Sequence, residues 1–327
     1  MSSIMLLLVM LLSIALQLTA VNSIGVCYGV YGNNLPRRRE VIDLYKSNGI
    51  GRMRIYYPDE YALQALRGSN IEVLLDVAKE TLPSLTNPAN ANAWVRKFVA
   101  SYPDVNIKYI AVGNEIGPHD NEASYILPGM QNIQKAISAA NLQGKVKVST
   151  AIKMDRLEDT SPPNKGKFKD TEYIQPIINF LVTNRAPLLA NVYPYFAYKE
   201  DTNGFIPLDF ALFRQQATNN GYQNLFDAML DSIYYALEKI GAPNLQVVVS
   251  ESGWPSYGGK GASVDNAGTY YQNLINHVQR GTPKRNGLIE TYLFAMFDEN
   301  NKDGDEIERH FGLFNPNKSP KYGIKFN

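Results

Sequence analysis

The chain has 327 residues, and its 32 Lys and Arg against 31 Asp and Glu leave a formal net charge of +1. That balance provides no electrostatic reason to expect a nucleic acid or an anionic membrane surface as a partner. With 45% hydrophobic and 19% charged residues, the composition is that of an ordinary globular protein, and no repeat or linker divides the chain. We therefore predict one large domain with a substantial core.

The first 23 residues differ in character from the rest of the chain. Leu, Met, Ile, Val and Ala dominate from Met5 to Leu18, and this run carries no charge. Val21 and Ser23 suit the small-residue positions before a signal-peptidase cut, so we predict a signal peptide over 1–23 and a catalytic domain over 24–327. An uncleaved membrane anchor is the alternative, but the apolar run is short for a membrane span. Secretion is favoured.

Strand-like runs recur along the mature chain, and segments with helical periodicity separate them. The eight runs cover residues 24–29, 52–57, 72–77, 107–115, 145–152, 188–196, 246–254 and 289–299. The first run contains Cys27, the single cysteine of the chain, which we expect to be a buried thiol. No intramolecular disulfide is possible, so core packing must supply the stability.

The alternation of strands and helices predicts the fold class. The clearest helical stripe has apolar residues at helical spacing from Phe226 to Ile240, with Asn224 as its cap and Gly241 at its end. Eight such strand–helix units match an α/β fold of the (β/α)₈ TIM-barrel type. A doubly wound open sheet is the alternative, but no glycine-rich dinucleotide turn follows the first strand. The longest insertion, 197–223, is expected to form a small excursion around the sixth unit.

Two of the strand-like runs end in a glutamate. Glu115 ends the fourth run, and Glu251 follows three consecutive valines in the seventh. Because a barrel presents the C-terminal ends of its strands on one face, both carboxylates are expected in one cleft. Two facing carboxylates in a cleft are typical of glycoside hydrolysis, in which one donates a proton and the other attacks or activates water.

Aromatic residues gather at the same strand ends and offer apolar faces for sugar rings. They are Tyr56, Tyr57, Tyr193, Tyr195, Phe196, Trp254, Phe294 and Phe297. Several of them can equally be packing residues of the barrel or its helices. The histidines His119, His277 and His310 are isolated and show no metal-ligand spacing, so we predict neither a metal nor a cofactor.

Several long stretches carry a family resemblance from Ile24 to the end of the chain. They are Gly25–Gly29, Gly32–Pro36, Arg54–Tyr56, Val112–Glu115, Asn191–Phe196, Val247–Ser256 and Phe294–Asn300. In this order they resemble plant endo-β-1,3-glucanases of glycoside hydrolase family 17. The resemblance implies a retaining mechanism, with Glu115 as general acid/base and Glu251 as nucleophile.

The resemblance also implies supporting roles around these two residues. Asn114 would bind the 2-hydroxyl of the sugar being cleaved, and Tyr56 would lie in the substrate cleft. Glu299 and Lys302 would form a supporting pair, with the lysine keeping nearby carboxylates ionised. Tyr193 and Trp254 are predicted as substrate-binding residues from their strand-end positions alone.

Alternatives in function remain open at this point. The first is endo-hydrolysis of β-1,3-glucan, such as callose, laminarin or fungal wall glucan. Endo-hydrolysis of mixed-linkage β-1,3-1,4-glucan is the second, and a non-catalytic glucan-binding protein is the third, although binding alone needs no pair of glutamates. We expect a monomer secreted to the apoplast or cell wall; the vacuole is less favoured because no C-terminal extension follows the predicted domain. Plant defence and remodelling of the plant's own wall fit equally.

Overall fold

The computed structural model describes residues 24–215 and 221–326. The predicted signal peptide, residues 1–23, lies outside the described residues and stays a prediction. None of the helices in the described ranges combines the length and apolar character that a membrane crossing requires.

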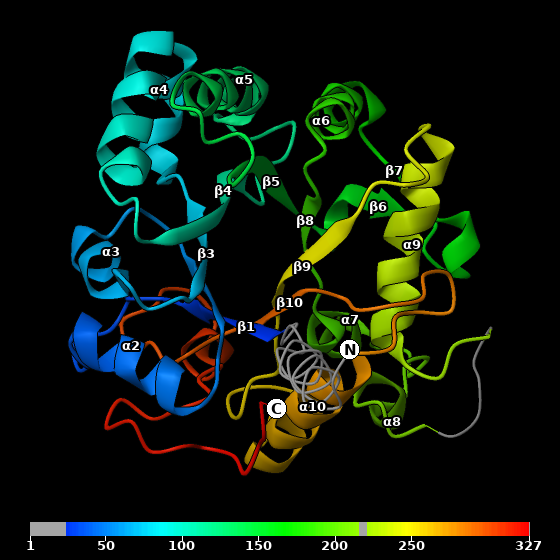
Figure 1. The fold of residues 1–327 in the computed structure, drawn as a ribbon. Coiled ribbons are helices and arrows are strands. Elements are labelled where there is room, and N and C mark those ends of the chain that lie inside the picture. The colour runs from blue at the N-terminus through cyan, green and yellow to red at the C-terminus, as the bar shows by residue number, and fades with distance from the viewer. Residues whose placement is uncertain (1–23, 216–220, 327) are drawn as a thin grey trace, which may run out of the picture.

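Within the described ranges, eight parallel strands close into a barrel (Figure 1). In chain order they are β1 (Ile24–Tyr28), β2 (Arg52–Ile55), β3 (Glu72–Asp76), β4 (Asn106–Asn114), β5 (Lys147–Lys153), β8 (Leu188–Asn191), β9 (Val247–Ser252) and β10 (Thr291–Leu293). Closure is visible at β1, where Gly25 pairs with Arg52 of β2 and Ile24 pairs with Thr291 of β10. The predicted (β/α)₈ barrel is therefore confirmed, and the open sheet is excluded.

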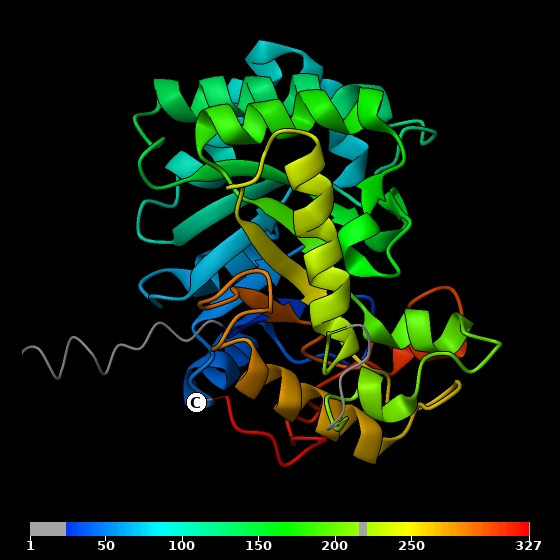
Figure 2. The same cartoon turned by 90° about the vertical axis from the view of Figure 1, so that its right-hand side faces the viewer.

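Helices surround the barrel on its outside (Figures 1 and 2). The longer ones are α2 (Arg38–Ser47), α3 (Glu60–Leu66), α4 (Pro88–Val95), α5 (Ala123–Ala139), α6 (Thr171–Asn184), α9 (Leu225–Lys239) and α10 (Val264–His277). Their ends follow local rules: the Asn224 side chain accepts the Asp227 backbone N–H at 2.7 Å and so caps α9 as predicted. Shorter turns are η1 (Lys79–Thr86), η2 (Arg96–Ala100) and η5 (Glu306–Arg309).

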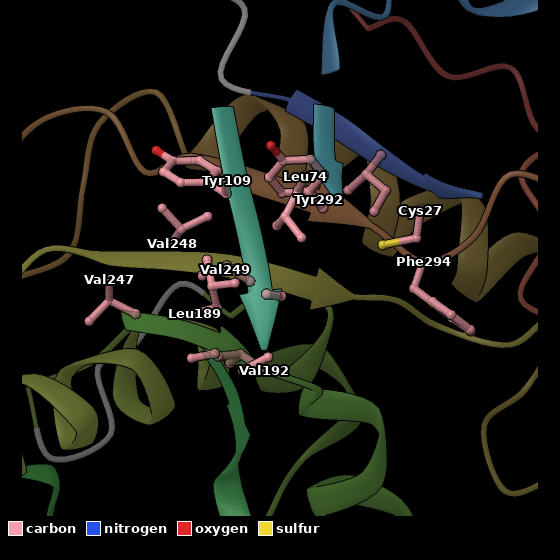
Figure 3. Packing of buried hydrophobic residues seen from close by; sticks show 14 of the residues in the cluster. Cys27, Leu74, Tyr109, Leu189, Val192, Val247, Val248, Val249, Tyr292 and Phe294 are labelled. Atoms are coloured by element: carbon pink, nitrogen blue, oxygen red, sulfur yellow. The ribbon is translucent and has the colours of Figure 1, made fainter. Parts of the chain in front are cut away.

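Apolar side chains from facing strands fill the barrel interior (Figure 3). Cys27 is fully buried, as predicted, and its Sγ donates to the carbonyl of Ser250 at 3.4 Å. Burial raises the pKa of this thiol, so it behaves as a small core residue. The three valines that open β9 are all buried, and so is Glu251 near the end of the strand.

Charged side chains close the N-terminal end of the barrel. Arg52 Nε lies 2.5 Å from Glu72 Oε2, and Lys108 Nζ lies 3.3 Å from Glu72 and 2.9 Å from Glu290. Arg52 also lies 3.7 Å from Glu290. We call these residues the lower ion network; its cations and anions balance in number.

Excursions interrupt the barrel at two places in the described chain. The predicted one follows β8 and contains α7 (Pro194–Glu200) and α8 (Leu208–Ala211). The strand ends at Asn191 and not at residue 196, because Pro194 begins a helix. A second excursion, not predicted, is the antiparallel pair β6 (Leu157–Glu158) and β7 (Lys167–Phe168), which packs against α9.

Candidate active site

The C-terminal ends of the barrel strands surround a cleft of about 650 Å³. Of the residues predicted from sequence, those that line it are Tyr56, Asn114, Glu115, Tyr193, Glu251, Glu299 and Lys302. Residues 115 and 251 thus share one cleft although 136 positions separate them in the chain. The barrel brings them together as expected, because parallel strands end on one face.

Glu251 is the last residue but one of β9, and donors hold both of its carboxylate oxygens. Its Oε1 accepts from Arg54 Nη1 at 2.9 Å and from the Tyr56 hydroxyl at 2.8 Å. Its Oε2 accepts from the Tyr193 hydroxyl at 2.7 Å. With 6% of the residue exposed, this carboxylate has one fixed orientation. It is arranged as a positioned anion facing the cleft, which is what a carboxylate nucleophile requires.

Arg54 is the centre of the site, and sequence reasoning gave it no role. Its fully buried guanidinium binds Asp76 through Nη2 at 2.6 Å and Nε at 3.1 Å. The same group donates to Asn114 Oδ1 at 2.9 Å and to Asn191 Oδ1 at 3.3 Å, besides Glu251. A buried cation needs such partners, since leaving one unpaired costs about 3–5 kcal/mol. Arg52 and Arg54 alternate with apolar residues along β2, and Tyr56 continues the alternation just after the strand. This period of two was the sequence signal that could have indicated an inward-facing arginine.

Glu115 follows β4 and lies in a different environment from Glu251. Its Oε1 accepts a hydrogen bond from Asn191 Nδ2 at 2.8 Å. The backbone turns sharply here, with φ of 88° at Gly113 and 60° at Glu115, and a Cβ at Gly113 would lie 2.5 Å from Ile126. Burial raises the pKa of Glu115, and the negative charge of Glu251 raises it further. This carboxyl is therefore suited to hold a proton and donate it.

Asn114 and Asn191 connect the two glutamates. Asn114 Oδ1 accepts from Arg54 and from Asn191 Nδ2, the latter at 3.0 Å. Because both donors meet the oxygen of Asn114, its amide nitrogen is the atom left to donate to a ligand. Asn191 had no role in the sequence analysis. Its amide nitrogen donates to Glu115 while its amide oxygen accepts from Arg54, so one side chain contacts both residues at once.

Glu299 and Lys302 both line the cleft, but their side chains pair differently from the prediction. Lys302 Nζ binds Glu308 Oε2 at 3.0 Å and lies 4.3 Å from the centre of the Phe294 ring. Glu299 Oε1 accepts the backbone N–H of Tyr31 at 2.7 Å. Burial raises the pKa of Glu299, and the charge of Lys302 opposes that rise. The lysine thus acts on Glu299 through charge, while its direct partner is Glu308, which the sequence analysis had not considered.

Trp254 does not offer an aromatic face to the cleft, so that prediction is wrong. The residue has no exposed surface, and its indole N–H donates to the Gly261 carbonyl at 2.9 Å. Its ring packs against Tyr195 and Tyr270, with centroids 5.0 and 5.5 Å away. At the preceding Gly253 a Cβ would lie 2.3 Å from the Phe294 carbonyl, so the chain is closely packed here, and the indole of Trp254 lies against Tyr270 of α10. Trp254 is a core residue.

Other side chains give the cleft an aromatic wall. Tyr193 contacts Phe294 and Phe311 edge to face, with ring centroids 6.2 and 6.0 Å apart, and both phenylalanines line the cleft. No cluster of His, Cys, Asp or Glu suited to hold a metal ion occurs in residues 24–215 and 221–326. The cleft combines carboxylates, amides and aromatic rings, a set suited to a neutral, hydroxyl-rich ligand.

Comparisons with known proteins agree with this chemistry. The family described as glycosyl hydrolases family 17 matches residues 24–326. A glucan endo-1,3-beta-glucosidase, acidic isoform GI9, from Nicotiana tabacum is 54% identical and covers 98% of this chain and 96% of its own. A glucan endo-1,3-beta-glucosidase from Vitis vinifera is 56% identical over 93% of this chain and 92% of its own.

Solved structures share the architecture at high identity. CJP38, a beta-1,3-glucanase and allergen of Cryptomeria japonica pollen, superposes with a TM-score of 0.89 at 46% identity, covering 93% of this chain and 99% of that one. A structure from a study of two plant beta-glucan endohydrolases with distinct substrate specificities gives 0.89 at 43% identity, covering 92% and 99%. On the extent of these matches, the chain belongs to glycosyl hydrolases family 17.

Proposed function

We propose that this protein is a retaining endo-glucanase that hydrolyses internal β-1,3-glucosidic bonds. One observation carries the proposal: the cleft holds two glutamates in opposite environments. Arg54, Tyr56 and Tyr193 donate to Glu251, while burial and the neighbouring anion favour a proton on Glu115. This division of roles is what a glycosidase with two catalytic carboxyls needs, and the family resemblance adds the retaining mechanism. The relatives named glucan endo-1,3-beta-glucosidase support β-1,3-glucan as the substrate.

The reaction proceeds in two displacements. Glu115 gives its proton to the glycosidic oxygen as the bond from C1 to that oxygen breaks, and a Glu251 oxygen bonds to C1 to form a glycosyl-enzyme ester. Glu115, now ionised, takes a proton from water as the water oxygen attacks C1. The bond between C1 and Glu251 breaks in the same displacement, which leaves Glu251 as a carboxylate and Glu115 protonated, as at the start.

Neighbouring residues assist each displacement. The free amide nitrogen of Asn114 donates to the 2-hydroxyl of the reacting sugar, a contact that strengthens in the transition state. Tyr56 and Tyr193 fix the two oxygens of Glu251 before substrate arrives. Glu299 and Lys302 line the same cleft, and the lysine charge opposes protonation of the glutamate.

Product analysis tests this function directly. The purified chain is given laminarin and a mixed-linkage β-1,3-1,4-glucan, and products are separated by chromatography while proton NMR follows the anomeric form released first. We expect a ladder of oligosaccharides from laminarin, with the β-anomer first. Faster cleavage of the mixed-linkage glucan would favour the second candidate function, endo-hydrolysis of β-1,3-1,4-glucan. That function would use the same catalytic residues. Release from neither glucan would favour a binding protein.

We further propose that the protein is a monomer secreted to the cell wall space, where a polysaccharide is its partner. The apolar segment before residue 24 supports the secretion. Expression of a fluorescent fusion in plant cells, with and without residues 1–23, tests it. Wall fluorescence of the full chain and retention of the truncated one are expected. Vacuolar fluorescence of the full chain would contradict the proposal.

A further inference from the structure

The cleft extends well beyond the catalytic glutamates. Many of its lining residues follow β1, β2 and β3, including residues 77–80 and Leu82 after β3. On this side Tyr31 and Tyr57 also line the cleft, with 65% and 37% of their surfaces exposed. Large exposed aromatic rings inside a cleft differ from scattered surface aromatics, because a ligand that enters the cleft can cover them. The two-step reaction described above uses neither tyrosine.

The backbone around Tyr31 is fixed even though its ring is exposed. Its N–H donates to Glu299 Oε1 at 2.7 Å, and its carbonyl accepts from the Asn301 N–H at 3.0 Å. The same loop is tied again by reciprocal bonds, from Asn33 N–H to Asn300 Oδ1 at 3.2 Å and from Asn300 Nδ2 to Asn33 Oδ1 at 2.8 Å. Because the loop after β10 holds the loop after β1 in this way, little backbone order remains to be lost on binding.

Tyr57 is anchored from its hydroxyl end. The hydroxyl lies 3.4 Å from Asp59 Oδ2, and Asp59 is itself bound by Arg38 at 2.7 Å. Asp59 also caps α3 through the N–H groups of Tyr61 and Ala62. The ring is therefore supported by a fixed carboxylate, while part of its surface stays open to the cleft.

We propose that Tyr31, with Tyr57 as a second contact, forms a sugar-stacking subsite for a glucosyl residue distant from the bond being cleaved. The occupant is the same neutral β-glucan chain that reaches the catalytic pair, since one continuous cleft contains both. An aromatic face suits the C–H face of a pyranose ring, and a tyrosine on a fixed backbone segment binds it at low entropic cost. The proposal rests on the proposed glucanase function. It assigns to Tyr31 part of the dependence of KM on the length of the glucan substrate.

Kinetics on oligosaccharides of increasing length test this subsite. Laminari-oligosaccharides of three to eight sugars are given to the wild type and to the variants Tyr31→Ala and Tyr31→Phe. For the longest substrates, Tyr31→Ala should raise KM about tenfold, the size of one aromatic contact, with kcat changed less than threefold. On the trisaccharide its effect should be below threefold. Tyr31→Phe, which keeps the ring, should recover most of the lost affinity.

A matched control removes an aromatic ring outside the cleft. Tyr61 is 81% exposed on α3 and is not one of the residues that line the cleft in the described chain, so Tyr61→Ala should match the wild type at every length. Tyr57→Ala should show the length dependence of Tyr31→Ala at smaller size. Equal loss at all lengths, no loss in Tyr31→Ala, or the same loss in Tyr61→Ala would overturn the subsite while leaving the glucanase function standing. A wild type inactive on every β-glucan would overturn both.

Discussion

Ion networks lie at both ends of the barrel, a partly exposed one at the lower end and a buried one at the upper end, and β2 contributes an arginine to each. In the lower ion network, Arg52 and Lys108 meet Glu72 and Glu290, so cations and anions are equal in number. Although burial alone would raise it, the pKa of Glu72 is held below its ordinary value by Arg52 and Lys108. At this end of the barrel every charged group of the network has a partner of opposite charge within the network.

At the upper end the charges do not balance. Arg54 faces Asp76 and Glu251 directly and reaches Glu115 through Asn191. Burial raises the pKa of Asp76 to about 6 against the opposing effect of Arg54, and the pKa of Glu115 is raised as well. The comparison indicates that a balanced network closes the barrel, whereas at the upper end burial, with the added charge of Glu251, raises the pKa of Glu115.

The largest expected effect comes from removing one carboxylate at each end. Glu251→Gln should lower kcat on laminarin by roughly 10⁴-fold or more, the order found when a covalent nucleophile is lost. Glu290→Gln should keep kcat within about twofold and cost roughly 1–3 kcal/mol of unfolding free energy, since its network is partly exposed. Steady-state kinetics and urea unfolding provide the measurements. Substantial turnover in Glu251→Gln would remove our nucleophile assignment.

The two arginines of β2 should respond differently to lysine. In Arg54→Lys, a single ammonium cannot meet Asp76, Asn114 and Glu251 together, so kcat should fall by about 10²-fold through misplacement of the nucleophile. Arg52→Lys keeps a cation in the lower network and should change stability without changing kcat. Comparable losses of kcat in both variants would show that the two arginines affect activity only through folding. Melting curves would then show a lowered melting temperature in both variants.

Removing one hydroxyl beside the nucleophile should have a smaller effect. Tyr193→Phe deletes the donor to Glu251 Oε2, a hydrogen bond to a charged group worth about 1.5–3 kcal/mol, so kcat/KM should fall by roughly 10- to 100-fold. Tyr195→Phe is the matched control, because the Tyr195 hydroxyl has no hydrogen-bond partner in the described chain. Equal activity of Tyr193→Phe and the control would mean that the hydroxyl does not position Glu251.

The smallest expected effect on catalysis is at Trp254. Because its indole N–H binds the Gly261 carbonyl away from the cleft, Trp254→Phe should lower the melting temperature and change KM by less than about twofold. A large rise in KM with unchanged stability would return Trp254 to the substrate-binding residues.

Much of this arrangement could be predicted because it follows from strand periodicity and barrel geometry. Runs of buried residues ending in Glu115 and Glu251 predict two carboxylates on one face once the strands are known to be parallel. The buried thiol of Cys27 and the cap at Asn224 follow from local rules of the same kind. These features depend on neighbours in sequence or on the fold class alone.

The remaining features depend on which way a side chain turns after a strand ends. Trp254 lies only three residues after Glu251, yet its side chain is buried in the core, where it packs against Tyr195 and Tyr270. Arg54 and Asn191 meet across the barrel, 137 positions apart, and no local pattern pairs them. Lys302 binds Glu308 because the 3₁₀ turn η5 brings that carboxylate back to the cleft. Such contacts are set by tertiary packing.

Direct titration of Glu115 tests the central claim, that burial and the neighbouring charge of Glu251 raise the pKa of this residue. Carbon-13 NMR of the glutamate carboxyls, assigned by comparison with Glu115→Gln, gives its pKa in the wild type and in Glu251→Gln. We predict a pKa above the ordinary glutamate range in the wild type, and therefore a fall in kcat/KM as pH rises through it, because the protonated form starts the reaction. In Glu251→Gln, loss of the neighbouring charge should lower that pKa. A Glu115 that titrates in the ordinary range, or that is unchanged in Glu251→Gln, would contradict the account.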